Sequence, residues 1–366
     1  MSDVDNSDMA GRPSGAWHQI ARDIPIYIIS LGLLAVVWTL QVVYGQPPNI
    51  ETVARNFRLY FAAILVLGFV HLLVLLIANR PDSPISFVRE RYSALATSPA
   101  FLARLPLFAM LVVMMPLFSA MKSMIPLFNP YSWDATFIAW DQAIFFGHDA
   151  WQVLQPALGF PVVTATLAFL YHTWILLPYV GTIYILFFAA GARVMRQYML
   201  AFFMTWSLIG GLLATFLSSV GPVFLQPLLG NDHFAAQMAY LHAANEQVPI
   251  MTLRVQELLV EWHNAKENGL GAGITAMPSM HVAMAFLFWL AMRRISRLLG
   301  AFFLGFFVIT WISSVHLAYH YAVDGLVAIV AVSAIWWSAG AVLKWWDARL
   351  DLRAQPTLRT NTVPAE

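Results

Sequence analysis

Apolar segments long enough to cross a membrane recur along this chain and exclude most other folds. Eight are visible, with approximate bounds 24–44, 57–78, 105–121, 161–190, 198–220, 278–292, 298–315 and 323–343. About 20 apolar residues in a helix span the hydrocarbon core of a bilayer, and helices satisfy their own backbone hydrogen bonds there. Only 11% of the residues are charged, against about 25% in a soluble domain. The sequence predicts an all-α protein, a polytopic integral membrane helix bundle with about eight transmembrane helices.

Composition removes several classes of function. The chain has no cysteine, which excludes disulfides, thiol catalysis and thiolate metal sites. Its formal net charge of +1 gives no reason to expect nucleic acid as a partner. Membrane lipids are the expected surroundings, and the sequence does not specify an oligomeric state.

The basic residues predict an orientation. If the N-terminus is cytoplasmic, eight spans bring the C-terminus to the same side. Fifteen of the 20 basic residues then lie in cytoplasmic segments, as the positive-inside rule requires. Lys122, His281, His320 and the pair Gly221-Pro222 all fall on the opposite, outer face.

Two histidine motifs flank the sixth and seventh apolar segments. The first is Pro278-Ser279-Met280-His281, and the second is His316-x3-His320-x3-Asp324. The spacing of His320 and Asp324 places them on one face of a helix. The carboxylate then holds one imidazole nitrogen and leaves the other free as a nucleophile or base, while His281 is a candidate general acid. Such a pair of histidines suits phosphoryl transfer.

The first motif also predicts an anion site. Pro278 fits the first turn of a helix, and Thr275 is a candidate cap for it. The free N–H groups of Ser279, Met280 and His281 would then face a phosphate, with the helix dipole adding to the attraction.

Other polar residues keep two interpretations. Asp134 and Asp141 are seven apart and would share a helix face, where they either position an acceptor hydroxyl or hold the outer segment together. Gly221-Pro222 either lines the site or only ends the fifth span. His316 would lie on the same helix face as His320 and is interpreted as a residue that supports the site residues or contacts the substrate.

A metal site is the alternative to metal-independent chemistry. Imidazole and carboxylate ligands from His281, His316, His320 and Asp324 would suit zinc. The prediction is nevertheless a site without metal or cofactor.

The two histidine motifs resemble the second and third signature motifs of the type-2 phosphatidic acid phosphatase superfamily, usually Pro-Ser-Gly-His and Ser-Arg-x5-His-x3-Asp. The resemblance implies a six-helix phosphatase-like core, with His320 as the nucleophile that becomes a phosphohistidine. It also implies Asp324 as the partner of His320, and His281 as the acid and then the base.

This sequence departs from the family pattern at several points. Met280 replaces the usual glycine, and Ser313-Ser314 stands where Ser-Arg is expected, so a phosphate-binding arginine is missing. The first motif, Lys-x6-Arg-Pro, appears only as Lys122-x6-Asn129-Pro130.

These departures are similar to those of one branch, the bacterial relatives of fungal inositol phosphorylceramide synthase. That branch implies a bacterial inner-membrane enzyme acting on a lipid phosphoester, with water or an alcohol as acceptor. The residues that carry the resemblance are Lys122, Ile125-Pro126, Asp134, Asp141, Gly221-Pro222-Val223-Phe224, Ala276 to His281 and His320-Tyr321-x-Val323-Asp324.

The chain is accordingly divided into four parts. These are a flexible tail (1–22), two N-terminal helices with a cytoplasmic loop (23–104), a catalytic membrane domain (105–346) and a second flexible tail (347–366). Within the catalytic domain, 122–159 is expected to lie on the membrane surface or to re-enter it. The competing hypothesis is a non-catalytic membrane transporter or lipid-binding scaffold.

Overall fold

The computed structural model describes residues 15–46, 49–189, 191–266 and 270–354, and this part of the chain is helical without strands. Seven segments are long and apolar enough to cross a membrane: Gln19–Val43, Ile50–Asn79, Pro99–Phe128, Pro161–Phe188, Ala192–Phe216, Arg297–His316 and Ala322–Leu352. The main helices in them are α1 (Gly15–Val43), α2 (Ile50–Asn79), α5 (Leu105–Phe128), α8 (Pro161–His172), α9 (Ala192–Met204), α15 (Arg297–His316) and α16 (Ala322–Ala354). The prediction of a polytopic helical membrane protein is confirmed.

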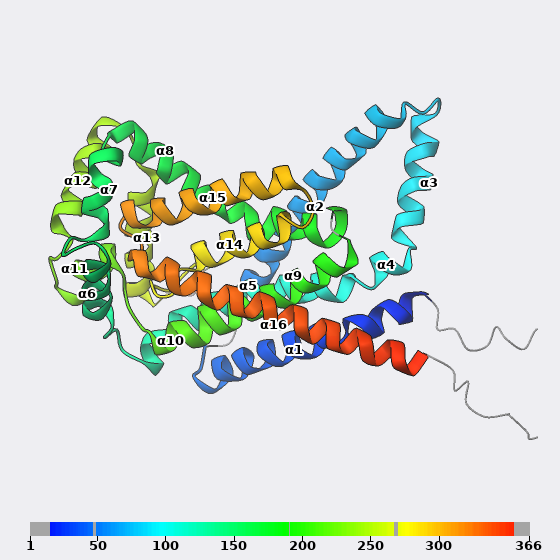
Figure 1. Cartoon of the computed structure of the whole chain (residues 1–366), viewed down its shortest axis with the longest axis horizontal. Helices are drawn as coiled ribbons and strands as arrows, with labels where there is room; N and C mark the ends of the chain where they lie inside the picture. The colour runs from blue at the N-terminus through cyan, green and yellow to red at the C-terminus, as the bar shows by residue number, and fades with distance from the viewer. Residues whose placement is uncertain (1–14, 47–48, 190, 267–269, 355–366) are drawn as a thin grey trace, which may run out of the picture.

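A shorter helix, α14 (Met280–Met292), occupies the middle of the bundle and packs against α15, α16 and α9 (Figure 1). Its 13 residues extend about 20 Å, less than the roughly 30 Å hydrocarbon core of a bilayer. The non-helical segment before it is buried in protein, at Ala272, Ile274 and Ala276 among others. Irregular backbone at membrane depth is tolerated in such a place, because the surrounding protein satisfies its polar groups.

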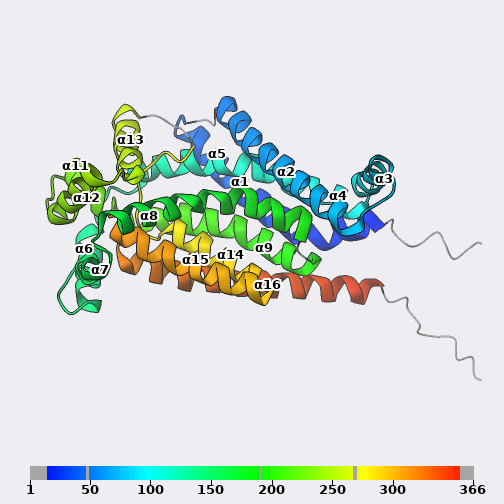
Figure 2. The same ribbon diagram turned by 90° about the horizontal axis from the view of Figure 1, so that it is seen from above.

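Short helices form a cap at one end of the bundle (Figures 1 and 2). They are α6 (Asp134–Ile144), α7 (Ala150–Leu158), α11 (Leu225–Leu229), α12 (Ala235–Gln247) and α13 (Met251–Ala265). The start of α1 and the end of α16 lie at the opposite end. There Arg196 Nε lies 2.7 Å from Asp23 Oδ1, and its Nη1 lies 2.8 Å from Asp347 Oδ2. The cap and the two described chain ends are therefore on opposite faces of the bundle.

Several helix ends differ from the sequence prediction. Helix α5 runs to Phe128 rather than ending at 121, because Ile125, Leu127 and Phe128 continue its apolar character past Lys122. Helix α1 begins at Gly15, inside the segment treated as a tail, and α16 continues to Ala354. Residues 1–14 and 355–366 of the two predicted tails lie outside the described residues.

The polar connections also contain helices that the apolar pattern does not reveal. Segment 80–104 holds α3 (Pro84–Ala96) and α4 (Pro99–Leu102). Segment 221–275 holds α11 and α12 beside the expected amphipathic helix, which is α13. The surface segment 122–159 contributes the end of α5 together with α6 and α7.

Candidate active site

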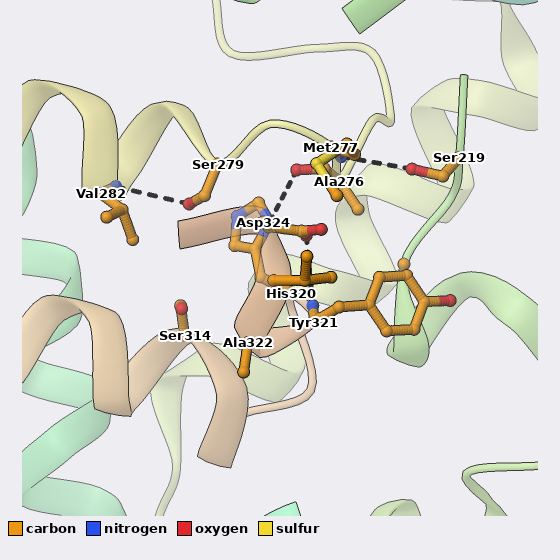
Figure 3. A network of polar contacts seen from close by, with 12 residues as sticks. Ser219, Ala276, Met277, Ser279, Val282, Ser314, His320, Tyr321, Ala322 and Asp324 are labelled. Carbon is orange, nitrogen blue, oxygen red and sulfur yellow. Dashed lines mark hydrogen bonds and ion pairs between the residues drawn. The ribbon is translucent and has the colours of Figure 1, made fainter. Parts of the chain in front are cut away.

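His320 lies in the turn between α15 and α16, where two acceptors hold one nitrogen of its ring (Figure 3). Nδ1 is 2.9 Å from the carbonyl oxygen of Ala276 and 3.0 Å from Oδ2 of Asp324. Because both partners only accept hydrogen bonds, Nδ1 carries the proton. In the neutral ring the free lone pair is therefore on Nε2, as a nucleophile requires.

The prediction that His320 and Asp324 share a helix is wrong, although the two side chains do meet. Helix α15 ends at His316, and Ala318 adopts a left-handed φ of 62° that breaks the helix. The N–H groups of Tyr319 and His320 then fold back onto the carbonyl of Ser314, at 3.0 and 3.1 Å. The turn thus replaces the helical geometry, and His316 is not on a common stripe with His320.

Asp324 lies in the first turn of α16 and is fully buried. Its Oδ2 also accepts a hydrogen bond from the N–H of Tyr321, at 3.1 Å. Its own carbonyl accepts from the N–H of Ser279, at 3.4 Å, which ties the second motif to the first. The carboxylate is therefore fixed from the backbone of the turn and can orient the His320 ring.

His281 is the second residue of α14 and faces the same place. Its ring centroid is 5.9 Å from that of His320. The rings of Tyr171 and Trp174 flank it, with centroids at 4.5 and 4.2 Å. The structure thus brings His281, His320 and Asp324 together from three elements, as the motifs indicate.

The start of α14 differs from the expected arrangement. The helix begins at Met280, after a cis Met277–Pro278 peptide bond, and Ser279 is its N-cap. Ser279 Oγ accepts from the N–H of Val282 at 3.4 Å, so the capping residue is not Thr275. The reason is that the N–H of Ser279 already donates to Asp324, which leaves Ser279 in an extended, non-helical conformation.

Met280 and Lys122 occupy different environments. Met280 is buried in the core and packs against Gly210, where an added Cβ would lie 3.0 Å from its sulfur. Lys122 is partly buried on α5, and its charge acts on both His281 and His320.

The carboxylates of Asp134 and Asp141 are engaged with backbone N–H groups. Asp134 accepts from the N–H of Val220 at 3.1 Å, from that of Gly221 at 2.9 Å and from the hydroxyl of Tyr321 at 2.8 Å. Asp141 accepts from the first turn of α16, from the N–H of Ala322 at 2.8 Å and that of Val323 at 2.9 Å. These bonds connect α6 to the residues that follow His320.

Gly221 and Pro222 lie directly behind the turn 317–321 that carries His320. Gly221 has a φ of 91°, and a Cβ there would lie 2.7 Å from the carbonyl oxygen of Tyr319 and 2.9 Å from Cβ of Ala276. Only glycine allows this backbone conformation and this close approach. Pro222 opens a short helical turn, Pro222–Phe224, that continues the same contact.

His316 contacts α8. Its Nε2 lies 2.9 Å from Oγ1 of Thr164, and the residue is 1% exposed. Among the described residues, no group of three or more His, Asp or Glu side chains is arranged to hold a metal ion. The four residues of the alternative zinc site are therefore not gathered as ligands.

Burial sets the ionisation of the groups in the turn and the cap. Burial, with the nearby charge of Lys122, lowers the pKa of His320 to about 3. Burial raises the pKa of Asp141 to about 6 and that of Tyr321 far above its usual range, with Asp134 adding to the rise for Tyr321. His320 is thus a neutral imidazole at neutral pH, with its one proton on Nδ1.

Three features of the site have no signal in the motifs. They are the Ala276 carbonyl, which holds His320, and the rings of Tyr171 and Trp174, which flank His281. The run Tyr171-His172-Thr173-Trp174 inside an apolar span is the one sequence hint, since polar aromatic residues there need partners.

No curated protein and no solved structure gave a significant match. The family model described as the PAP2 superfamily matches residues 135–338, a segment that contains His281, His320 and Asp324 but not Lys122. PAP2 membership supports an activity of the lipid phosphatase or phosphotransferase type. Because the match covers more than half of the 366 residues, the chain belongs to the PAP2 superfamily.

Proposed function

We propose that this protein transfers a phosphoryl-linked headgroup between lipid alcohols through a phosphohistidine on His320. The observation that carries the proposal is the pair of acceptors on His320 Nδ1, which directs the lone pair to Nε2. The centroid of the His281 ring lies 5.9 Å from that of His320, so the two imidazoles are neighbours.

The proposed reaction has two half-steps. In the first, Nε2 of His320 attacks phosphorus, the bond to the leaving oxygen breaks, and His281 gives that oxygen its proton. Asp324 offsets the positive charge that forms on the phosphorylated ring. In the second, the acceptor hydroxyl gives its proton to His281 while its oxygen attacks phosphorus, and the P–N bond breaks.

The charge of the site favours a phosphodiester as donor. Lys122 is the cation whose charge acts on both histidines. Arg254 is exposed on α13 and paired with Glu257 and Glu261. A phosphomonoester carries about −1.5 to −2 at pH 7, whereas a diester carries one charge and is matched by one lysine. This supports a headgroup transferase similar to inositol phosphorylceramide synthase over a phosphatase.

The test compares wild-type protein with His320→Ala in detergent and EDTA. Each is given phosphodiester and phosphomonoester lipids, with and without diacylglycerol or ceramide, while free phosphate and new phospholipid are both measured. We expect a new phospholipid only with a diester and an acceptor, and none from His320→Ala. His148→Ala is the matched control, because His148 is exposed on the same face of the bundle.

Each other result has a definite meaning. Phosphate release from a monoester without acceptor would make the protein a phosphatase with the same first half-step. Full activity in His320→Ala would refute the phosphohistidine. Loss of activity in EDTA would favour the metal alternative. A lack of any His320-dependent product would favour a transporter or lipid-binding scaffold.

We further propose that the site faces the outer side of a bacterial inner membrane, with both termini in the cytoplasm. The position of the cap opposite the ends of α1 and α16 and the positive-inside pattern support this orientation. Since the chain has no cysteine, a maleimide can react only with a cysteine that is introduced by substitution. An impermeant maleimide added to whole cells should label Asp232→Cys and not Ala348→Cys. The reverse pattern would invert the orientation.

A further inference from the structure

The imidazole of His281 sits between two aromatic rings. Tyr171 stacks on it with a centroid distance of 4.5 Å and an interplanar angle of 20°, and Trp174 lies 4.2 Å away at 41°. Tyr319 in turn stacks on Tyr171, at 5.1 Å and 19°. His281 is therefore held in an aromatic stack that spans α8, α14 and the catalytic turn.

The charged and titratable groups around His281 do not favour a positive ring. They are Lys122 from α5, His172 from α8 and His320 from the turn, each of which is neutral or positive. Within the described part of the chain, no carboxylate forms a hydrogen bond or ion pair with His281. In contrast, His320 has Asp324 as its partner.

The proposed mechanism nevertheless requires His281 to carry a proton beside these groups. The imidazolium must exist before the leaving oxygen takes its proton, and it forms again when the acceptor is deprotonated. The face of an aromatic ring attracts a cation, more strongly when water is excluded. The two rings on His281 are within the distance over which this attraction acts.

We propose that Tyr171 and Trp174 are positioning residues that stabilise the protonated form of His281 through their ring faces, in place of a carboxylate. This proposal rests on the phosphohistidine mechanism above. The hydroxyl of Tyr171 is buried and has no hydrogen-bond partner among the described residues. The ring rather than the hydroxyl is then the part of Tyr171 that acts on His281.

The pH dependence of the reaction rate can show whether the two rings stabilise the protonated form of His281. The first half-step needs His281 protonated, so activity falls on the basic side of the pH–rate profile when the proton is lost. Without a flanking ring, the proton is lost at lower pH. We expect the basic limb of kcat/KM in Trp174→Leu to move down by about one pH unit, a tenfold change in the ionisation constant.

Trp206→Leu is the matched control. Trp206 is a buried tryptophan of the same core whose ring centroid is 6.3 Å from that of Trp174, and its ring contacts are with Trp174, Phe118 and Phe202 rather than His281. Its basic limb should stay at the wild-type position. Trp174→Phe, which keeps a weaker ring face, should move the limb by less than Trp174→Leu. Tyr171→Phe should keep the limb, whereas Tyr171→Leu should lower it.

The outcomes separate this inference from the function on which it rests. If product formation does not depend on His320, the mechanism itself fails. If product formation depends on His320 but the limb is unmoved in Trp174→Leu and Tyr171→Leu, the ring-face role is refuted. Equal shifts in Trp174→Leu and Trp206→Leu would also refute it, because the effect would then come from general repacking.

Discussion

Gly221→Ala should disable the catalytic turn while leaving the bundle folded. The backbone of Gly221 has φ 91° and ψ 163°, a region that is essentially restricted to glycine. A non-glycine residue in such a conformation costs on the order of 1–3 kcal/mol. The added methyl group would also lie 2.7 Å from the Tyr319 carbonyl and 2.9 Å from Cβ of Ala276.

These two neighbours are the ones that fix His320. The Ala276 carbonyl accepts the Nδ1–H of His320 at 2.9 Å, and Tyr319 precedes His320 in the chain. To reach an ordinary contact distance, the Tyr319 carbonyl must recede by about 0.7 Å. A similar displacement of Ala276 would lengthen the bond to His320 beyond ~3.5 Å and break it. A misplacement of about 1 Å at a reacting group costs on the order of a hundredfold in rate.

The assay is turnover of a fluorescent phosphodiester lipid with a diacylglycerol acceptor, beside thermal unfolding in detergent. The control is Gly230→Ala, since Gly230 also has a positive φ of 66° but an added Cβ meets nothing within 4 Å. We expect Gly230→Ala to lower stability by about 1–2 kcal/mol with near-normal turnover. Gly221→Ala should lose about 10- to 100-fold in kcat. Wild-type turnover in a folded Gly221→Ala protein would refute this account of how His320 is positioned.

Two further predictions concern ionisation and the cap. Because burial holds the pKa of His320 at about 3, protonation of His320 should not limit activity above about pH 5. An acid limb of the pH–rate profile near pH 6.5 that disappears when another residue is substituted would agree with this expectation. An acid limb there that comes from protonation of His320 itself would contradict it. Asp141→Ala leaves the buried N–H groups of Ala322 and Val323 without their acceptor, which should destabilise the protein by about 2–5 kcal/mol. Thermal unfolding measures this loss, exposed Asp232→Ala serves as its control, and equal stability of the two variants would contradict it.

The membrane fold could be predicted because each span carries its own signal. Long apolar runs fix helices without reference to the rest of the chain, and α15 (Arg297–His316) lies where the run 298–315 places it. Helix ends depend on more than apolarity. Helix α5 continues past Lys122, and α14 starts after Ser279 because the Ser279 N–H is used by Asp324.

The sequence predicts the reacting residues of the site but not the residues that hold them in place. The motifs identify His281, His320 and Asp324, and the structure brings these residues together. The partners of Asp134 and Asp141 lie more than 80 residues away in the sequence, and no local pattern indicates them. The aromatic rings on His281 were missed for the same reason, since Tyr171 and Trp174 lie far from His281 in the sequence.

The residues that hold the turn around His320 share a physical cause. Irregular backbone beside a membrane has polar groups that need hydrogen-bond partners. The turn that carries His320 is not helical, so its polar groups need partners from elsewhere. Cap side chains provide them: Gln237 donates to the carbonyls of Val315 and His316, Gln256 donates to that of Leu317, and Asp141 accepts from Ala322 and Val323. Each of these three side chains is buried. The cap therefore does more than cover the site, because the position of the nucleophile depends on it, and substitutions in α6, α12 or α13 should affect catalysis without contacting substrate.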